Sequence, residues 1–137
     1  MPELNIENHK KWVEALESGE FMQGRTQLCR KASQGRFEFC CLGVAEFLAQ
    51  QEKRPNLTRE EFCDRFGHCA GLYSSGRSWL GVDSALPMLE SSELYYHTLN
   101  DITGKNFREI ARYIRIAILK EDVSEPDLSE AEVMSPV

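Results

Sequence analysis

The chain has 137 residues, of which 42% are hydrophobic and 28% are charged, and its formal net charge is −6. This length suits one domain with a hydrophobic core of its own, and the composition excludes collagen-like, low-complexity and wholly disordered chains. The longest apolar run, residues 39–45, is too short to cross a membrane, and the first residues lack the basic and apolar segments of a secretory signal.

The first predicted element is a helix over residues 8–17, because its apolar side chains recur at helical spacing. These side chains are Trp12, Val13 and Leu16. Gly19 follows as a left-handed terminator. Residues 21–35 show little periodicity and predict a loop, with room for one helical turn over 26–31.

A strand that leads directly into a helix is predicted next. Charged and aromatic residues alternate over 36–40, which is typical of a short strand. The helix covers 42–51, and Gly43 in its first turn would let another backbone approach closely. Its buried face consists of Cys41, Val44, Ala45 and Leu48.

Two further short helices are predicted in the second half of the chain. Thr58 and Glu61 form a capping box that opens a helix ending at Gly67. Residues 68–84 are rich in Gly and Ser, so they predict a long irregular stretch with room for a small hairpin. A short helix is expected over 94–99.

The clearest helix begins after Asn106 and is expected to anchor the core. Its apolar face consists of Phe107, Ile110, Ala111, Ile114 and Ile118. Beyond this helix, residues 121–132 hold six acids and no Lys or Arg, so the rest of the chain is neutral. We therefore expect one compact, mainly helical α+β domain with a short sheet or hairpin over residues 1–121, and an acidic disordered tail over 122–137.

The five cysteines are odd in number and follow no export signal, so reduced thiols in the cytoplasm are expected. Cys40 and Cys41 lie where the strand meets the helix, and amide N–H groups there would stabilise a thiolate. Paired with His97 and oriented by Asn100 or Asp101, either thiol would suit a cysteine-dependent hydrolase or transferase. The alternative interpretation is that both thiols fill the core, as free cysteines commonly do.

The sequence predicts no metal or other cofactor and gives little support for nucleic acid as a partner. Cys63 and Cys69 are separated by five residues, which is wider than the usual spacing of a structural zinc pair. The neutral body lacks the broad basic surface that sequence-independent nucleic-acid binding requires. A local basic stretch leaves room for a modest anion site, and it consists of Arg25, Arg30, Lys31 and Arg36.

Several short motifs follow one another in a fixed order over residues 11–118. The most specific are Phe-Cys-Cys-Leu-Gly-Val at 39–44 and Leu-Asn-Asp at 99–101. The others are Trp12-Val-Glu-Ala-Leu16, Ser18-Gly19, Gln23-Gly24-Arg25, and Phe107 with Ile110-Ala111. This arrangement resembles a family of small uncharacterised proteins encoded by phages, prophages and some bacteria. The resemblance implies a phage or prophage source and the cytoplasm of the host cell, and it carries no activity.

The leading functional prediction is a non-catalytic intracellular binding protein. A phage origin would fit a factor that acts on a host protein, and the basic stretch would fit a small anionic ligand; no membrane partner is expected. The binding surface would use polar residues next to a glycine or a turn, namely Gln23, Arg25, Asn100 and Asp101. The alternative is the cysteine-dependent hydrolase or transferase that uses Cys40 or Cys41.

Overall fold

The structure, a computed structural model of the chain, describes residues 4–84, 86–87, 96 and 105–121. In chain order the elements are α1 (Ile6–Glu17), β1 (Met22–Gln23), β2 (Cys29–Lys31), a 3-10 turn (Ser33–Gly35), β3 (Phe37–Phe39), α2 (Cys41–Lys53), α3 (Arg59–Phe66), α4 (Ser74–Leu80) and α6 (Phe107–Ala117). Helices dominate and one small sheet is present, so the predicted mainly helical α+β class is confirmed. The predicted tail over 122–137, and the predicted helix over 94–99 apart from Tyr96, lie outside the described residues.

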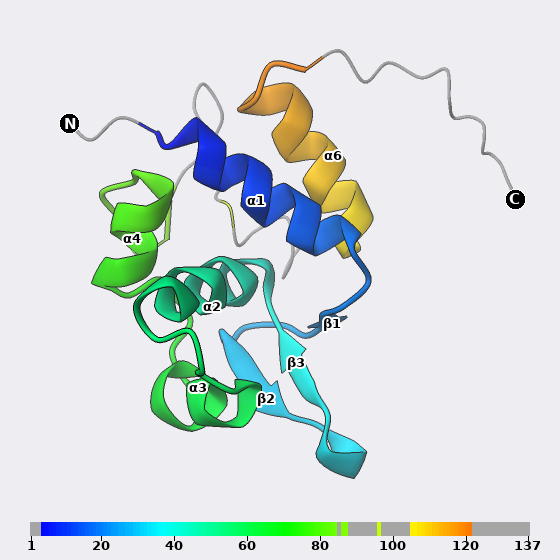
Figure 1. The fold of residues 1–137 in the computed structure, drawn as a ribbon. Coiled ribbons are helices and arrows are strands. Elements are labelled where there is room, and N and C mark those ends of the chain that lie inside the picture. The colour runs from blue at the N-terminus through cyan, green and yellow to red at the C-terminus, as the bar shows by residue number, and fades with distance from the viewer. Residues whose placement is uncertain (1–3, 85, 88–95, 97–104, 122–137) are drawn as a thin grey trace, which may run out of the picture.

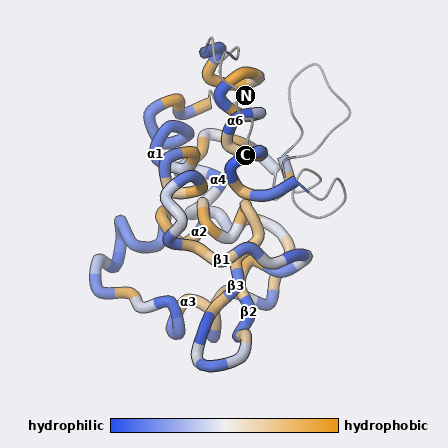
Figure 2. Tube along the Cα trace, turned by 90° about the vertical axis from the view of Figure 1, so that its right-hand side faces the viewer, coloured by the Kyte–Doolittle hydropathy of each residue, from blue (hydrophilic) through white to orange (hydrophobic). Residues whose placement is uncertain are grey.

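The elements form two ends that meet at α2 (Figure 1). In the helical end, which we define as α1, α4 and α6, α6 lies along α1, and α4 packs against both α1 and α2. In the sheet end, which we define as the three strands with α3, α3 packs on β2 and β3. Hydrophobic residues concentrate along α2 (Figure 2), where residues 41–47 are all buried. The centre of the core is therefore a single helix that serves both ends.

The sheet has the strand order β1-β3-β2, with β1 parallel and β2 antiparallel to β3. The outer edge of β2 continues onto residues 67–69, because the Leu28 N–H donates to the Cys69 carbonyl at 2.7 Å and the Cys29 N–H donates to the Gly67 carbonyl at 3.1 Å. The prediction of a strand over 36–40 is confirmed. The prediction of a loop over 21–35, with a helical turn at 26–31, is wrong at β1 and β2, because these two short strands form hydrogen bonds with β3 and with residues 67–69.

The close backbone approach predicted at Gly43 is confirmed. Gly43 lies in the first turn of α2, and a Cβ there would collide with the carbonyl oxygen of Leu28. Gly67 meets the same segment from the other side, since a Cβ at Gly67 would collide with the carbonyl oxygen of Cys29. The backbone at the start of β2 therefore lies in close contact with two glycines, Gly43 and Gly67.

Three helix starts are fixed by side-chain caps, and the sequence predicts two of them, at Thr58 and Asn106. The capping box of Thr58 with Glu61 opens α3, and one formed by Asn106 with Glu109 opens α6. The helix predicted over 8–17 begins two residues earlier, because Asn5 accepts from the Asn8 N–H at 2.9 Å. The predicted apolar face of α6 is buried at every position, Phe107, Ile110, Ala111, Ile114 and Ile118.

The helix α4 lies within residues 68–84, where an irregular stretch was expected, so that prediction is wrong for Ser74–Leu80. Its amino end is held by a buried carboxylate of α2, because Glu46 Oε1 accepts from the Tyr73 N–H at 2.8 Å. Gly76 lies against that carboxylate, and a Cβ there would collide with it. The side chain of Trp79 in this helix is buried, and its Nε1 donates to Glu52 at 2.7 Å.

Candidate functional site

The two thiols considered as nucleophiles are buried in the core. Cys40 is the N-cap of α2 and is 1% exposed, and its Sγ accepts from the Gly43 N–H at 3.3 Å. Cys41 is 0% exposed, and its Sγ donates to the Tyr96 carbonyl at 3.4 Å. The predicted partners His97 and Asn100 lie outside the described residues. The Cys–His pairing therefore stays a prediction, while the core position of both sulfurs is a feature of the fold.

The other three cysteines lie at the sheet end and next to it. Burial raises the pKa of the Cys29 thiol well above its usual range, and the neighbouring Cys63 thiol raises that pKa further. The Cys69 Sγ is 2.9 Å from the Tyr73 hydroxyl, and this hydrogen bond, with burial, raises the pKa of Tyr73 to about 12. Among the residues that the structure describes, no group of three or more His, Cys, Asp or Glu side chains is placed to hold a metal ion.

The structure describes two of the four residues predicted to form the binding surface. Gln23 lies in β1, and its Nε2 donates to the Lys105 carbonyl at 2.8 Å, so this side chain ties the sheet to the segment that precedes α6. Arg25 follows β1 and is exposed. Asn100 and Asp101 lie outside the described residues, so their juxtaposition with Gln23 and Arg25 stays a prediction.

The basic stretch of the sequence is divided in space. Arg30 pairs with Glu38 across the β2–β3 ladder at 2.9 Å, and Lys31 pairs with Asp64 of α3 at 3.3 Å. Arg36 lies apart from these pairs and lines a pocket. Arg30 and Lys31 are therefore paired with carboxylates of the protein. An anion that bound to the predicted basic stretch would have to compete with these carboxylates for both cations.

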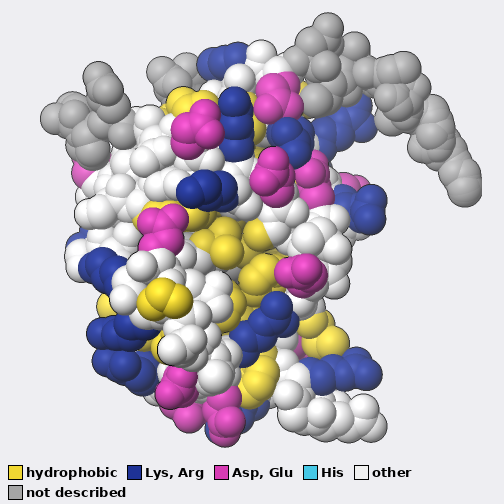
Figure 3. Space-filling view, viewed as in Figure 1, with side chains coloured by type: hydrophobic (Ala, Val, Ile, Leu, Met, Phe, Trp, Pro, Cys, Tyr) yellow, Lys and Arg dark blue, Asp and Glu magenta, His cyan; other side chains and the backbone are white. Residues whose placement is uncertain are grey.

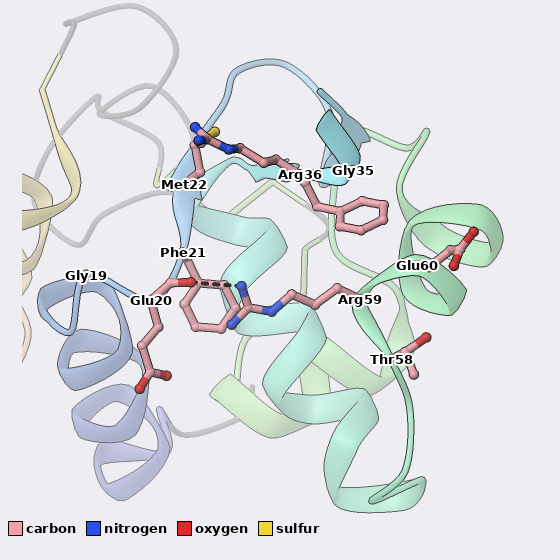
Figure 4. A pocket seen from close by; sticks show the side chains of 10 residues that line it. Gly19, Glu20, Phe21, Met22, Gly35, Arg36, Thr58, Arg59 and Glu60 are labelled. Carbon is pink, nitrogen blue, oxygen red and sulfur yellow. Dashed lines mark hydrogen bonds between the residues drawn. The ribbon is translucent and has the colours of Figure 1, made fainter. Parts of the chain in front are cut away.

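The pocket that Arg36 lines has a volume of about 750 Å³ and is built from three separate segments. Residues 19–22 connect α1 to the sheet and include β1, residues 35–37 lead into β3, and residues 58–60 begin α3. We call it the Arg59 pocket, because the side chain of Arg59 occupies its middle (Figure 4). A short turn, an edge strand and a capped helix start thus converge on one hollow.

The Arg59 guanidinium is held in place by contacts that leave its charge uncompensated. Its central carbon lies 4.4 Å from the centroid of the Phe21 ring, which is a cation–π contact. Its Nη1 donates to the Glu20 carbonyl at 2.8 Å. No carboxylate of the described part of the chain forms an ion pair with it, and Figure 4 shows the Glu20 and Glu60 side chains turned away from it. The Arg59 guanidinium is therefore positioned by an aromatic ring and a backbone carbonyl.

No local pattern in the sequence identifies Arg59 or Phe21 as a site residue. The capping box identifies Arg59 as the first helical residue, but no spacing in the sequence links it to residues 19–22 or 35–37. Arg36 was noted only as one member of a basic stretch. Figure 3 shows apolar side chains reaching the surface in the middle of one face, with charged side chains around them. The contact between the Arg59 guanidinium and the Phe21 ring depends on tertiary structure.

Comparison with known proteins identifies a family and no activity. Residues 4–118 match the family model described as "Domain of unknown function (DUF8296)". No curated protein and no solved structure matches the chain. None of the helices in the described part of the chain is long and apolar enough to span a membrane.

Proposed function

The chain belongs to the DUF8296 family, and we propose that it is a non-catalytic binding protein that holds an anionic ligand in the Arg59 pocket. The observation that carries this proposal is the guanidinium of Arg59, fixed over the Phe21 ring in a hollow of about 750 Å³. The burial of Cys40 and Cys41 favours a non-catalytic role, because a substrate could not reach either sulfur without a rearrangement of the core.

A guanidinium held in this way suits anion recognition. An arginine side chain has five N–H donors in a planar fork that matches two oxygens of a carboxylate or phosphate. Ordering a long side chain costs conformational entropy, and here the contact with Phe21 and the hydrogen bond to the Glu20 carbonyl meet that cost before a ligand arrives. The ligand therefore gains the charge-assisted bonds without ordering the receptor.

The setting that we propose follows from the resemblance to phage and prophage proteins. The protein would act in the cytoplasm of a host cell, and the anion would belong to a host molecule. A carboxylate on a host protein and a small anionic metabolite present the same group to Arg59. Either a host protein or a small host metabolite could therefore bind in the pocket through the same contact between an anionic group and Arg59.

The test is an NMR titration of the full chain with four simple anions: phosphate, sulfate, acetate and benzoate. At least one anion should cause saturable shifts in the amides of residues 19–22, 35–37 and 58–60. Arg59→Gln should abolish these shifts. Arg65→Gln is the matched control, since Arg65 lies on the same helix with its guanidinium 5.4 Å from the Phe66 ring and outside the Arg59 pocket. If no anion shifts the pocket amides, or if both variants respond as the wild type does, the proposed function is wrong.

A further inference from the structure

The charge and shape of the Arg59 pocket point to one class of anion. We infer that its ligand carries a single carboxylate on a planar apolar body, as an aromatic acid does, and that phosphates are poor ligands. This inference rests on the proposed function and narrows it. Three features of the pocket carry it: the balance of charge, the apolar wall and the volume.

The balance of charge favours a ligand with one negative charge. Arg36 and Arg59 line the pocket together with Glu20 and Glu60, so its formal charges cancel. The two carboxylates turn away from the guanidinium, but they remain on the rim of the same hollow (Figure 4). A carboxylate would gain its bonds from Arg59 and meet little repulsion there. A phosphate dianion would gain the same fork and meet both rim carboxylates with twice the charge.

The apolar wall supplies a surface for the body of the ligand. Phe21 is fixed by edge contacts with two core rings, at centroid distances of 5.1 Å to Phe39 and 5.9 Å to Phe47. Met22 and Phe37 line the pocket beside it and are both half-buried. Apolar side chains held at a partly exposed surface gain when a planar apolar group covers them. A body of this kind would therefore bind against the same wall that positions the guanidinium.

The volume leaves room for a ligand larger than a bare anion. Pockets of about 300–1,000 Å³ suit drug-sized ligands, and the Arg59 pocket lies within that range at about 750 Å³. Acetate or inorganic phosphate would leave most of this hollow to water and most of the wall uncovered. The carboxylate has two natural sources, a free aromatic acid or the C-terminal residue of a peptide, and both present the same chemistry to Arg59.

The experiment compares dissociation constants for probes that change one property at a time, measured by NMR titration of the full chain. Phenylacetate should bind about tenfold more tightly than acetate, the factor expected from covering roughly two CH₂ groups of apolar surface. Phenylacetamide, which keeps the ring and removes the charge, and inorganic phosphate should both bind more weakly than phenylacetate. Tighter binding of N-acetylphenylalanine would identify a peptide terminus as the source, and tighter binding of phenylacetate would identify a free acid. Either result supports the shared carboxylate.

Variants separate this inference from the proposed function. Arg59→Lys keeps the charge but removes the planar fork, and it should weaken phenylacetate binding while leaving the fold intact; Arg65→Gln is the matched control. If phosphate binds more tightly than phenylacetate at the same amides, the inference is overturned and the proposed function stands. If phenylacetamide binds as tightly as phenylacetate, the inference is also overturned, because the carboxylate is then not recognised. If no anion reaches the pocket, both fail together.

Discussion

The two ends of the molecule are held together by different kinds of interaction. At the sheet end, phenylalanine rings pack on one another with centroid distances between 5.1 and 5.9 Å, and they are Phe21, Phe39, Phe47, Phe62 and Phe66. At the helical end, apolar packing is joined by a buried hydrogen bond between side chains, in which His9 Nε2 lies 3.1 Å from the Tyr96 hydroxyl. The central helix α2 serves both, with Phe47 in the ring cluster and Glu46 holding α4. Both ends thus have apolar cores, and they differ in that the sheet end has a cluster of phenylalanine rings and the helical end has a buried hydrogen bond between side chains.

Arg115 at the helical end and Arg59 at the sheet end also differ in the groups that surround their guanidinium groups. Arg115 of α6 binds Glu17 through two bonds of 2.8 and 2.9 Å and also binds Glu121, so its charge is matched twice. Arg59 at the sheet end lies on a ring and has no carboxylate partner among the described residues. A cation that stabilises the fold is thus distinguished from one that is available to a ligand. The comparison also predicts that pH acts on the helical end through the buried His9, and that salt acts there through the ion pairs of Arg115.

The largest effect is expected at the sheet end, from Gly43→Ala. The new methyl group would collide with the Leu28 carbonyl, and backbone on both sides gives it nowhere to move. We expect a loss of about 3 kcal/mol or more in the free energy of unfolding, measured with urea. Gly35→Ala is the control, since it has a positive φ of +72° and no neighbouring atom within 4 Å. It should cost only about 1 kcal/mol for the backbone conformation. Equal losses in the two variants would contradict the close contact at Gly43.

The elements that the sequence predicts are those defined by local patterns, whichever end they belong to. The face of α6 and both capping boxes are local patterns, since their partners lie within a few residues, and all three are found. The strands β1 and β2 are two and three residues long and are defined by hydrogen bonds to β3 and to residues 67–69. No local pattern encodes such partners, so these strands were missed.

The candidate site was missed for a related reason. Gln23 was chosen because it is polar and adjoins a glycine, yet its amide is used to bind the Lys105 carbonyl. Arg59 looked like an ordinary first residue of a capped helix. Its importance arises only where Phe21 supplies a ring and Glu20 a carbonyl, and both come from a segment about forty positions earlier in the chain. The polarity of a residue does not predict whether its side chain forms hydrogen bonds within the protein or remains accessible to a ligand.

The second effect, a dependence of stability on pH, is expected at the helical end. His9 is fully buried; its Nδ1 lies 2.9 Å from the Asn5 carbonyl oxygen, which only accepts, so Nδ1 carries the proton. Its Nε2 therefore accepts from the Tyr96 hydroxyl at 3.1 Å. Burial lowers the pKa of His9 below its ordinary value of 6.5. The unfolded chain thus binds a proton more readily, so stability is complete above pH 6.5 and falls as the pH drops through and below it.

The measurement is the urea unfolding free energy between neutral and mildly acidic pH. One such group changes stability by at most about 1.4 kcal/mol per pH unit. His9→Gln should flatten the curve below pH 6.5, because Gln does not titrate. His68→Gln, at an exposed position, should leave it unchanged. A wild-type curve that His9→Gln does not alter would contradict the buried neutral imidazole, and a change confined to His68→Gln would do the same.

The smallest effect is expected from Arg115→Gln, which removes the ion pairs between α6 and Glu17 and Glu121. Partly exposed pairs of this kind contribute about 1 kcal/mol or less, even with two-point geometry, because water screens them. The loss should shrink as salt is raised, since screening weakens the wild-type pairs that the variant already lacks. Lys10→Gln breaks the more exposed 3.8 Å pair with Glu7 and should have no measurable effect at any salt concentration. A loss from Arg115→Gln that stays constant with salt would mean that the guanidinium stabilises α6 by packing, and the helical end would then resemble the sheet end more closely than its hydrogen bonds indicate.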